Sequence, residues 1–218
     1  MSKENGVIYR ISGPVVTAVG ISPRMYEVVR VGNEGLMGEV IELHGDQSVI
    51  QVYEETSGVR PGEPVVRTGQ TLSVQLGPGL LTKIYDGIQR PLPELEKTMG
   101  VFITRGVDAD GLDLEKIWAF SATAKKGDSV SSGDVLGTVQ ETKTIEHRVM
   151  VPPGISGKIK EIKSGDYNVT QTVCTLEDGT EVQMMQKWPV RTPRPFTKKH
   201  APEVPLPVSY THLRAHET

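Results

Sequence analysis

Cysteine, aromatic residues and long apolar runs are all scarce in this sequence of 218 residues. Cys174 is the one cysteine, so the chain cannot close an internal disulfide, and a cysteine-based zinc site has too few ligands. We expect it to be a small buried hydrophobe on a strand. No run approaches the ~18 apolar residues of a membrane span, and residues 1–6 lack the apolar core of a signal peptide. The sequence therefore predicts a soluble protein that is not exported and works in a reducing, cytosolic setting.

Negatively charged residues are in small excess over positively charged ones. The formal net charge is −3 at pH 7, and no basic face of the kind that nucleic-acid binders carry stands out. The sequence thus argues against a nucleic-acid partner. Its most basic stretch, residues 187–200, is interrupted by Pro189, Pro193 and Pro195. We interpret this stretch as an extended, solvated linker, with an anion-binding site as the less favoured alternative.

Turn-forming residues, in contrast, are abundant, since the chain has 23 glycines and 15 prolines. This share exceeds that of an average domain and stays below that of a disordered chain. In the first part of the chain, turn signals separate short β-branched runs at residues 7–11, 15–19, 26–31 and 48–53. Such spacing is typical of an antiparallel barrel or sandwich, and we predict a small closed β-barrel. The dipeptide Gly45-Asp46 fits a two-residue hairpin loop with a type II′ turn.

The middle of the chain indicates one short helix and a second β module. Pro93 at a first-turn position, acidic residues early in the segment and Gly100 just past its end favour a helix over residues 93–100. Residues 118–186 hold further short runs with turn dipeptides of their own. The helical segment and the acidic stretch 108–113 separate the two β regions. The expected fold class is therefore all-β.

Motifs that carry chemistry are missing. The Gly157-Lys158 pair has no glycine five residues earlier and no hydroxyl residue after it, so it is not a phosphate-binding loop. Residues 108–113 resemble the start of a calcium loop, but their glycine comes fourth rather than sixth. His212 and His216 have a zinc-ligand spacing without the glutamate of a zincin motif. The sequence therefore predicts no catalytic, cofactor-binding or metal-binding residue.

One stretch resembles a cofactor carrier. Residues 126–143 and 151–159 look like a biotinyl or lipoyl domain, in which a lysine at the tip of a tight hairpin carries the cofactor. Lys143 would be that lysine. The lipoyl pattern Glu-Thr-Asp-Lys is replaced here by Glu141-Thr142-Lys143, and the spacing to the following Val-Pro-Pro-Gly is too long. We therefore expect the presenting hairpin to be lost and keep the resemblance for the fold only, as a barrel-sandwich hybrid.

Longer phrases of the sequence carry a second resemblance. They include Gly-Pro-Gly-Leu-Leu and Asp-Gly-Ile-Gln-Arg-Pro-Leu, and they lie at residues 6–16, 31–41, 51–58, 76–81, 85–92, 151–154 and 187–195. In this order, across about residues 6–206, the chain resembles the catalytic A (alpha) subunit of the V/A-type rotary ATPases and ATP synthases.

That resemblance implies a division of the chain. Residues 1–74 would be a six-stranded β-barrel that joins a crown of barrels, and residues 75–109 the start of a truncated α/β P-loop nucleotide-binding domain. Residues 110–190 would be the bulge insertion that marks the A-type chain, and residues 191–206 a basic, proline-rich linker. Residues 207–218 resemble translated sequencing-adapter sequence, so we interpret them as a non-native tail, with a genuine disordered tail as the alternative.

The resemblance also implies a function. The family couples ATP synthesis or hydrolysis to H⁺ or Na⁺ transport, and the full-length protein binds ATP or ADP with Mg²⁺. The family's P-loop and catalytic glutamate would follow the last matching residue, so this fragment is expected to supply ring assembly and stator contacts without catalysis.

The expected partners are B subunits in an alternating A3B3 hexamer and the central and peripheral stalk subunits. The membrane would be reached only indirectly, from a cytoplasmic, peripheral head. A carrier domain and a stand-alone β interaction module are the alternatives.

Overall fold

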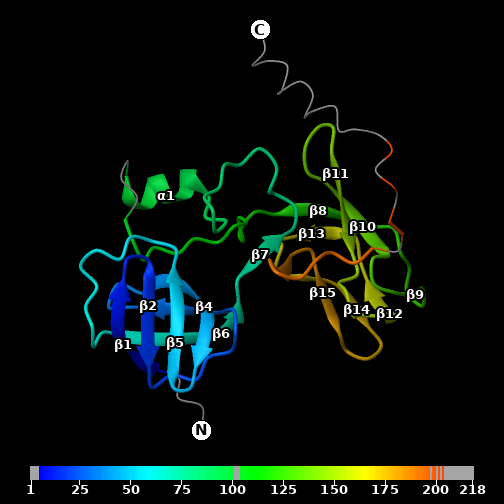
Figure 1. Ribbon diagram of the computed structural model, residues 1–218. Coiled ribbons are helices and arrows are strands. Elements are labelled where there is room, and N and C mark those ends of the chain that lie inside the picture. Colours follow the sequence, from blue (N-terminus) through cyan, green and yellow to red (C-terminus); the bar gives the residue numbers. More distant parts are fainter. Residues whose placement is uncertain (1–4, 101–103, 197, 200, 202, 204–218) are drawn as a thin grey trace.

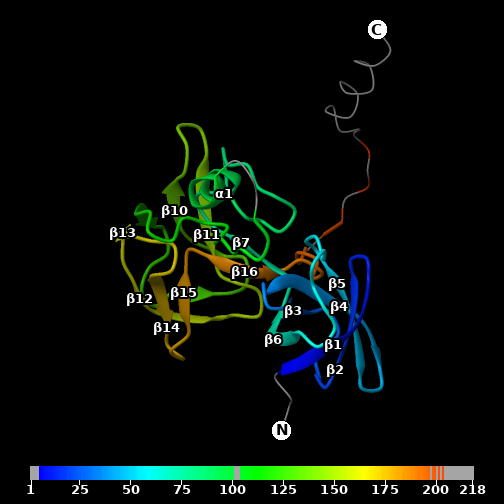
Figure 2. The ribbon, with the colours of Figure 1, turned by 90° about the vertical axis from the view of Figure 1, so that its left-hand side faces the viewer.

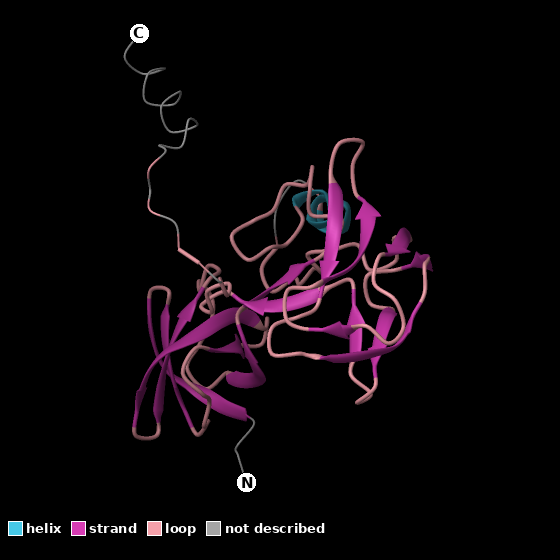
Figure 3. Ribbon diagram, turned by 90° about the vertical axis from the view of Figure 1, so that its right-hand side faces the viewer, coloured by secondary structure: helices cyan, strands magenta, loops and turns pink. Residues whose placement is uncertain are grey.

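The computed structural model describes residues 5–100, 104–196, 198–199, 201 and 203, which form two β units and one short helix (Figures 1 and 3). In chain order the elements are β1 (Asn5–Ser12), β2 (Val15–Val19), β3 (Glu27–Val31), β4 (Leu36–His44), β5 (Gln47–Val52), β6 (Pro64–Thr71), β7 (Ser73–Leu76), α1 (Leu92–Met99), β8 (Trp118–Ala122), β9 (Ser129–Val130), β10 (Val135–Gln140), β11 (Glu146–Met150), β12 (Gly157–Ile162), β13 (Gly165–Tyr167), β14 (Thr172–Leu176), β15 (Glu181–Gln183) and β16 (Gln186–Pro189). The all-β expectation is confirmed. Within the described ranges, no helix has the length and apolar character of a membrane span.

The first unit is a closed antiparallel barrel with the strand order β1-β2-β5-β4-β3-β6. Side chains on each strand alternate between its interior and its outer surface. In β2, for example, Val16 and Ala18 are fully buried while their neighbours are partly exposed. Leu36 of β4 and Ile50 of β5 complete the same apolar interior. The small closed barrel predicted from turn spacing is therefore confirmed, with six strands.

Glycines set two details of the barrel. His44 pairs with Gln47 across the β4–β5 hairpin, so Gly45 and Asp46 form a two-residue loop. Gly45 has a φ of 62° while the φ of Asp46 is negative, which fits the type II′ turn expected from the sequence. In β4, a Cβ on Gly38 would lie 2.7 Å from Cγ2 of Ile50, so the absent side chain lets β5 pack closely.

The second unit consists of two four-stranded sheets, with the orders β11-β10-β8-β13 and β15-β14-β12-β9. Its core is apolar and includes Phe120, Leu136, Ile159 and Leu176, each 2% exposed or less. Phe120 packs over Gly137, where a Cβ would lie 2.4 Å from its Cζ. The second β module predicted from the sequence is confirmed.

A two-stranded sheet of β7 and β16 joins the units, and Figure 2 shows it between them. Its register runs from Ser73 opposite Pro189 to Leu76 opposite Gln186. The chain therefore enters and leaves the second unit side by side. The interpretation of residues 187–200 as a solvated linker is wrong for its first part, because residues 187–189 pair with β7.

The helix α1 begins after Pro91, has Pro93 in its first turn and buries Leu95. It ends at Met99, and the C-cap residue Gly100 has a φ of 78°, which suits glycine. The short helix predicted from these signals is confirmed. His200 and the expected tail at residues 207–218 lie outside the described residues.

Candidate functional site at the barrel junction

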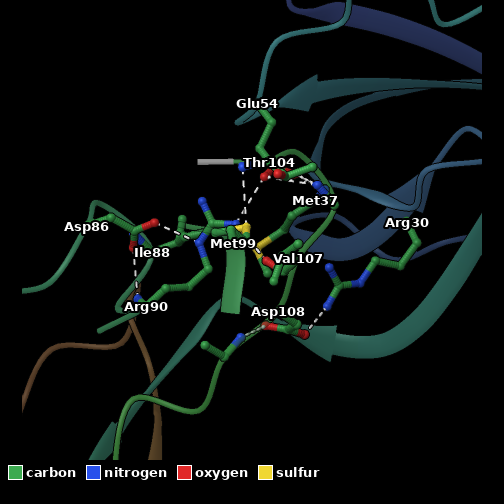
Figure 4. A network of polar contacts seen from close by, with 12 residues as sticks. Arg30, Met37, Glu54, Asp86, Ile88, Arg90, Met99, Thr104, Val107 and Asp108 are labelled. Carbon is green, nitrogen blue, oxygen red and sulfur yellow. Dashed lines mark hydrogen bonds and ion pairs between the residues drawn. The ribbon is translucent and has the colours of Figure 1, made fainter. Parts of the chain in front are cut away.

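Arg90 is the centre of a polar network between the barrel and the segment that follows β7 (Figure 4). The residue is 7% exposed. Its Nε donates to Oδ2 of Asp86 at 2.7 Å, and its Nη1 donates to Oε1 of Glu54 at 3.0 Å and to the carbonyl of Val107 at 2.7 Å. One guanidinium thus bridges two carboxylates from separate parts of the chain, a geometry that its fixed fork of donors favours.

Local sequence explains how Asp86 presents its carboxylate. In the turn after Asp86, its Oδ1 accepts hydrogen bonds from the backbone N–H groups of Ile88 at 3.0 Å and Arg90 at 2.8 Å. Aspartate favours such turns because its short side chain can reach its own backbone. Burial alone would raise the pKa of Asp86, but the backbone and guanidinium hydrogen bonds from Arg90 leave the pKa below its usual value. The carboxylate therefore stays charged and keeps Arg90 in place.

Glu54, two residues after the end of β5, is the barrel residue in this network. Its carboxylate also accepts hydrogen bonds from the backbone N–H groups of Met37, at 3.4 Å, and Gly106, at 3.2 Å. Gly106 lies so close to the barrel that a Cβ there would be 2.2 Å from the carbonyl oxygen of Glu34. Arg30 of β3 pairs with Asp108 two residues further on. The returning segment 105–108 is therefore fixed to the barrel at several points.

A second arginine fastens the chain after β16. The guanidinium of Arg191 donates to both carboxylate oxygens of Glu39, at 3.0 and 2.6 Å, and lies 4.2 Å from the ring centroid of Tyr26. Glu39 is 2% exposed and also accepts from the hydroxyl of Tyr53 at 2.9 Å. The Arg191 hydrogen bonds hold the pKa of Glu39 below its usual range, and burial with the Glu39 contact raises the pKa of Tyr53 to about 12. The expected linker is thus anchored to the barrel wall.

Both arginines hold a segment of the chain against the barrel through ion pairs. We call these contacts the Arg90 clamp, formed with Asp86 and Glu54, and the Arg191 clamp, formed with Glu39. Within the described ranges, no three His, Cys, Asp or Glu side chains are grouped to hold a metal ion. Gly157 and Lys158 start β12 and pair with Val130 and Ser129, so they form ladder contacts and not a phosphate loop.

The acidic stretch that resembled a calcium loop is engaged in other contacts. Asp108 pairs with Arg30, and Asp110 accepts from the side-chain amide of Gln75 at 2.7 Å. Asp113 caps the backbone N–H groups of residues 115 and 116, each at 3.1 Å. The structure therefore brings these carboxylates to the junction and not around a common centre.

Other sequence candidates lie apart from the junction. Cys174 is buried on β14, where burial raises the pKa of its thiol. Lys143 is exposed in the loop between β10 and β11, and Gln140 pairs with Glu146 at the base of this loop. The expectation that this hairpin is lost is therefore wrong, because a five-residue loop closes it. His212 and His216 lie outside the described residues.

Sequence reasoning did not single out Arg90, Glu54, Glu39 or Arg191. The Asp-Gly turn before Arg90 was a usable signal, because it predicts where the aspartate oxygens point. For Glu39 no local signal exists, since Arg191 is 152 residues away.

A closed β-barrel is followed by a barrel-sandwich unit, and the two-stranded sheet of β7 and β16 joins them. This arrangement defines a scaffold of tandem β domains. Two family models match these units in order. The β-barrel domain of the ATP synthase alpha/beta family matches residues 8–69, and the ATP synthase alpha/beta subunit barrel-sandwich domain matches residues 109–191. The chain belongs to the ATP synthase alpha/beta family, as the sequence resemblance indicated.

Curated relatives place the chain within that family. It is 64% identical over 201 residues to the A subunit of the A-type ATP synthase of Methanosarcina barkeri, a match that covers 92% of this chain and 35% of the relative. The corresponding protein of Methanoculleus marisnigri is 62% identical over 94% of this chain and 35% of its own length. The corresponding protein of Natronomonas pharaonis is 56% identical over 93% of this chain and 35% of its own length. The chain thus spans about a third of the length of the curated relatives it matches.

Proposed function

We propose that this chain acts as the N-terminal region of the catalytic A subunit of a V/A-type rotary ATPase, which couples ATP synthesis or hydrolysis to H⁺ or Na⁺ transport. The observation that carries the proposal is the match to the A subunits of A-type ATP synthases at 56–64% identity over more than nine tenths of the chain. The order of the two matched domains supports it. These matches also favour this role over a lipoyl or biotinyl carrier.

In this proposal the described part serves assembly. The full-length subunit binds ATP or ADP and Mg²⁺ through its nucleotide-binding domain. The sequence of this chain contains no phosphate-binding loop of its own. Residues 75–109 act as the start of that domain, and the Arg90 network sets its position relative to the barrel. A rigid junction is useful there, since a binding site must be held to within a fraction of an ångström by its support.

The partners in this proposal are B subunits, which alternate with A subunits in an A3B3 hexamer, and the central and peripheral stalks. The barrel joins the crown of the hexamer, and residues 110–190 form a bulge that faces the stator. The complex is cytoplasmic and peripheral to the membrane. One surface suited to a neighbouring barrel lies on β1 and β6, where Val7, Tyr9 and Val66 are 45%, 61% and 39% exposed.

The test mixes this chain with the B subunit of Methanosarcina barkeri and follows complex formation by size-exclusion chromatography and native mass spectrometry. We expect a mixed complex, and we expect Val66→Lys to weaken it by about tenfold, because an unpaired charge in an apolar contact costs free energy. Leu43→Lys is the matched control, because Leu43 is 42% exposed on β4. Absence of any complex, with both proteins folded, would contradict the assembly role.

Calorimetry with Mg-ATP tests separately whether this chain binds nucleotide. We expect no heat of binding from the chain alone. Micromolar binding of Mg-ATP would overturn the division between an assembly region and a nucleotide-binding domain.

A further inference from the structure

Glu141 makes an unusual contact for a residue at the start of a hairpin loop. It follows β10 directly, yet its side chain is only 6% exposed. Its Oε1 accepts hydrogen bonds from the backbone N–H groups of Gly79 at 2.7 Å and Leu81 at 3.1 Å, which lie 62 and 60 residues earlier. A carboxylate that accepts two N–H groups forms charge-assisted bonds, about twice as strong as neutral ones.

The loop that Glu141 holds connects β7 with the junction. Gly79 has a φ of 107°, and a Cβ there would lie 3.2 Å from Cζ2 of Trp118. A Cβ on Gly77 would lie 3.0 Å from Cδ1 of Leu112. The two glycines thus let the loop lie flat against the core of the second unit. The same chain segment continues to Asp86 and Arg90, so its position matters for the junction.

Hydrogen bonds within the hairpin tie its loop to its base. The backbone N–H groups of Glu141 and Thr142 both donate to the carbonyl of Ile145 at 3.1 Å, and the side-chain amide of Gln140 donates to the carbonyl of Thr142 at 2.6 Å. The tip protrudes at the top of Figure 1 beyond the body of the second unit. Lys143 is exposed there, so the tip is accessible from outside.

His147 of β11 supports the buried carboxylate from its other side. Its Nδ1 lies 3.7 Å from Oε2 of Glu141. Burial lowers the pKa of His147, although the charge of Glu141 acts in the opposite direction. At neutral pH the imidazole is therefore uncharged, and the hydrogen bonds from Gly79 and Leu81 are what tie Glu141 to a distant part of the chain.

We infer that the β10–β11 hairpin is a latch, in which Glu141 couples the exposed tip to the Gly79–Leu81 loop. Displacement of the tip withdraws the carboxylate and frees the loop, and displacement of the loop loosens the base of the hairpin. Coupling of this kind is reciprocal by thermodynamic necessity. The inference rests on these contacts and does not depend on the proposed rotary function.

Amide hydrogen exchange on the full chain, resolved by residue with NMR, tests the first direction. In Glu141→Ala we expect the amides of Gly79 and Leu81 to exchange about 10- to 100-fold faster, as the loss of hydrogen bonds to a charged group implies. Glu141→Gln should be intermediate, because one acceptor oxygen remains. Glu146→Ala, an exposed carboxylate of the same hairpin, is the control and should match the unmodified chain. Unchanged exchange at both amides in Glu141→Ala would overturn the latch.

The reverse direction separates a latch from a passive contact. Gly79→Ala places a Cβ against Trp118, so the loop must move, and we expect faster exchange at the amides of Glu141 and Thr142. If this variant does not fold, Leu81→Pro removes one of the two donors at an exposed position and gives the same readout. Hairpin amides that keep their exchange rates while the loop amides respond would rule out the coupling.

Discussion

The barrel and the second unit differ in what they bury. Glu27 and Glu39 lie in the barrel wall, each 2% exposed, and both bind arginine. In the described part of the second unit, the core is apolar, and the buried carboxylate of Glu141 lies outside this core, in the loop after β10. A carboxylate in a strand wall is stable only when its charge is compensated. The barrel therefore combines an apolar core with charged attachment points, whereas the second unit is stabilised chiefly by packing.

Three glutamates of the barrel bind arginines from different parts of the chain. Glu27 of β3 binds Arg67 of the neighbouring strand β6 at 2.8 Å, so this pair stays within the barrel. Glu39 binds Arg191, and Glu54 binds Arg90, so these pairs reach segments that enter and leave the second unit. Buried ion pairs add little stability compared with apolar packing, but they define which segments meet. The barrel is thus the part of the molecule that specifies how the segments beside it are arranged.

The largest effect is expected in the packed core of the second unit. Phe120→Ala removes a buried ring that packs over Gly137, and we expect it to lower the free energy of unfolding of this unit by about 3–5 kcal/mol. Both tryptophans, Trp118 and Trp188, lie on β8 and β16, so fluorescence in urea reports this transition. Val135→Ala, at a 36% exposed position, is the control, with an expected change within ~0.5 kcal/mol.

The same variant tests whether the two units are independent. We expect the barrel to keep its cross-strand NMR signals in urea at which the second unit of Phe120→Ala has unfolded. A single transition for both units would show that the charged clamps make one cooperative body, and the contrast between the regions would then be one of composition only.

The next largest effect is expected at the Arg90 clamp. Arg90→Leu leaves Glu54 and Asp86 with uncompensated charge, which costs about 3 kcal/mol for a buried pair that loses one partner. Urea unfolding measures the loss, and hydrogen exchange at residues 105–108 should rise because Gly106 depends on Glu54. Arg10→Leu, an exposed arginine of β1, should leave both unchanged. Equal effects of the two substitutions would mean that the clamp has no role in stability.

These clamps also mark where sequence reasoning ends. The barrel, its Gly45-Asp46 hairpin and α1 were predictable, because β-branched alternation, turn dipeptides and helix ends are local signals. β4 gave a weaker signal, since it contains Gly38 and the buried Glu39. Burial of a glutamate becomes favourable only when Arg191 arrives from the far end of the chain, and no local pattern encodes that meeting.

The candidate site shows the same limit. The turn at Asp86 is local and was predictable, but the choice of Glu54 as its second partner depends on how the segment after β7 packs against the barrel. At Lys143 the sequence led to a wrong expectation, because the spacing was compared with a shorter hairpin. Pairing of Gln140 with Glu146 continues around five loop residues without loss of the hairpin.

A pH-dependent effect is expected at the Glu39–Arg191 pair. The folded-state pKa of Glu39 is lowered, chiefly by the Arg191 hydrogen bonds, so the pair stabilises the fold above the unfolded pKa of about 4.3. This contribution is lost as the pH falls through the folded pKa. Urea midpoints of Arg191→Leu should therefore lie below those of the unmodified chain at neutral pH, and the gap should narrow below about pH 4.

Arg194→Leu is the matched control, because it removes the same charge from the same stretch but stacks on Trp188 rather than on a carboxylate. Its effect on the midpoint should be independent of pH. If the difference in urea midpoint between Arg191→Leu and the unmodified chain stays constant down to about pH 3, Glu39 is not a charged attachment point.

The smallest effect is expected where the second unit does hold a buried carboxylate, at Glu141. Burial lowers the pKa of His147, and the nearby charge of Glu141 partly offsets this. Glu141→Gln removes the offset, so the pKa of His147 should fall further and the imidazole should stay neutral to lower pH, as an NMR titration of its ring protons would record. Glu146→Gln should leave the curve unchanged. An unchanged pKa of His147 in Glu141→Gln would mean that the 3.7 Å approach of His147 Nδ1 to Glu141 Oε2 is absent in solution. The second unit would then rely on packing alone.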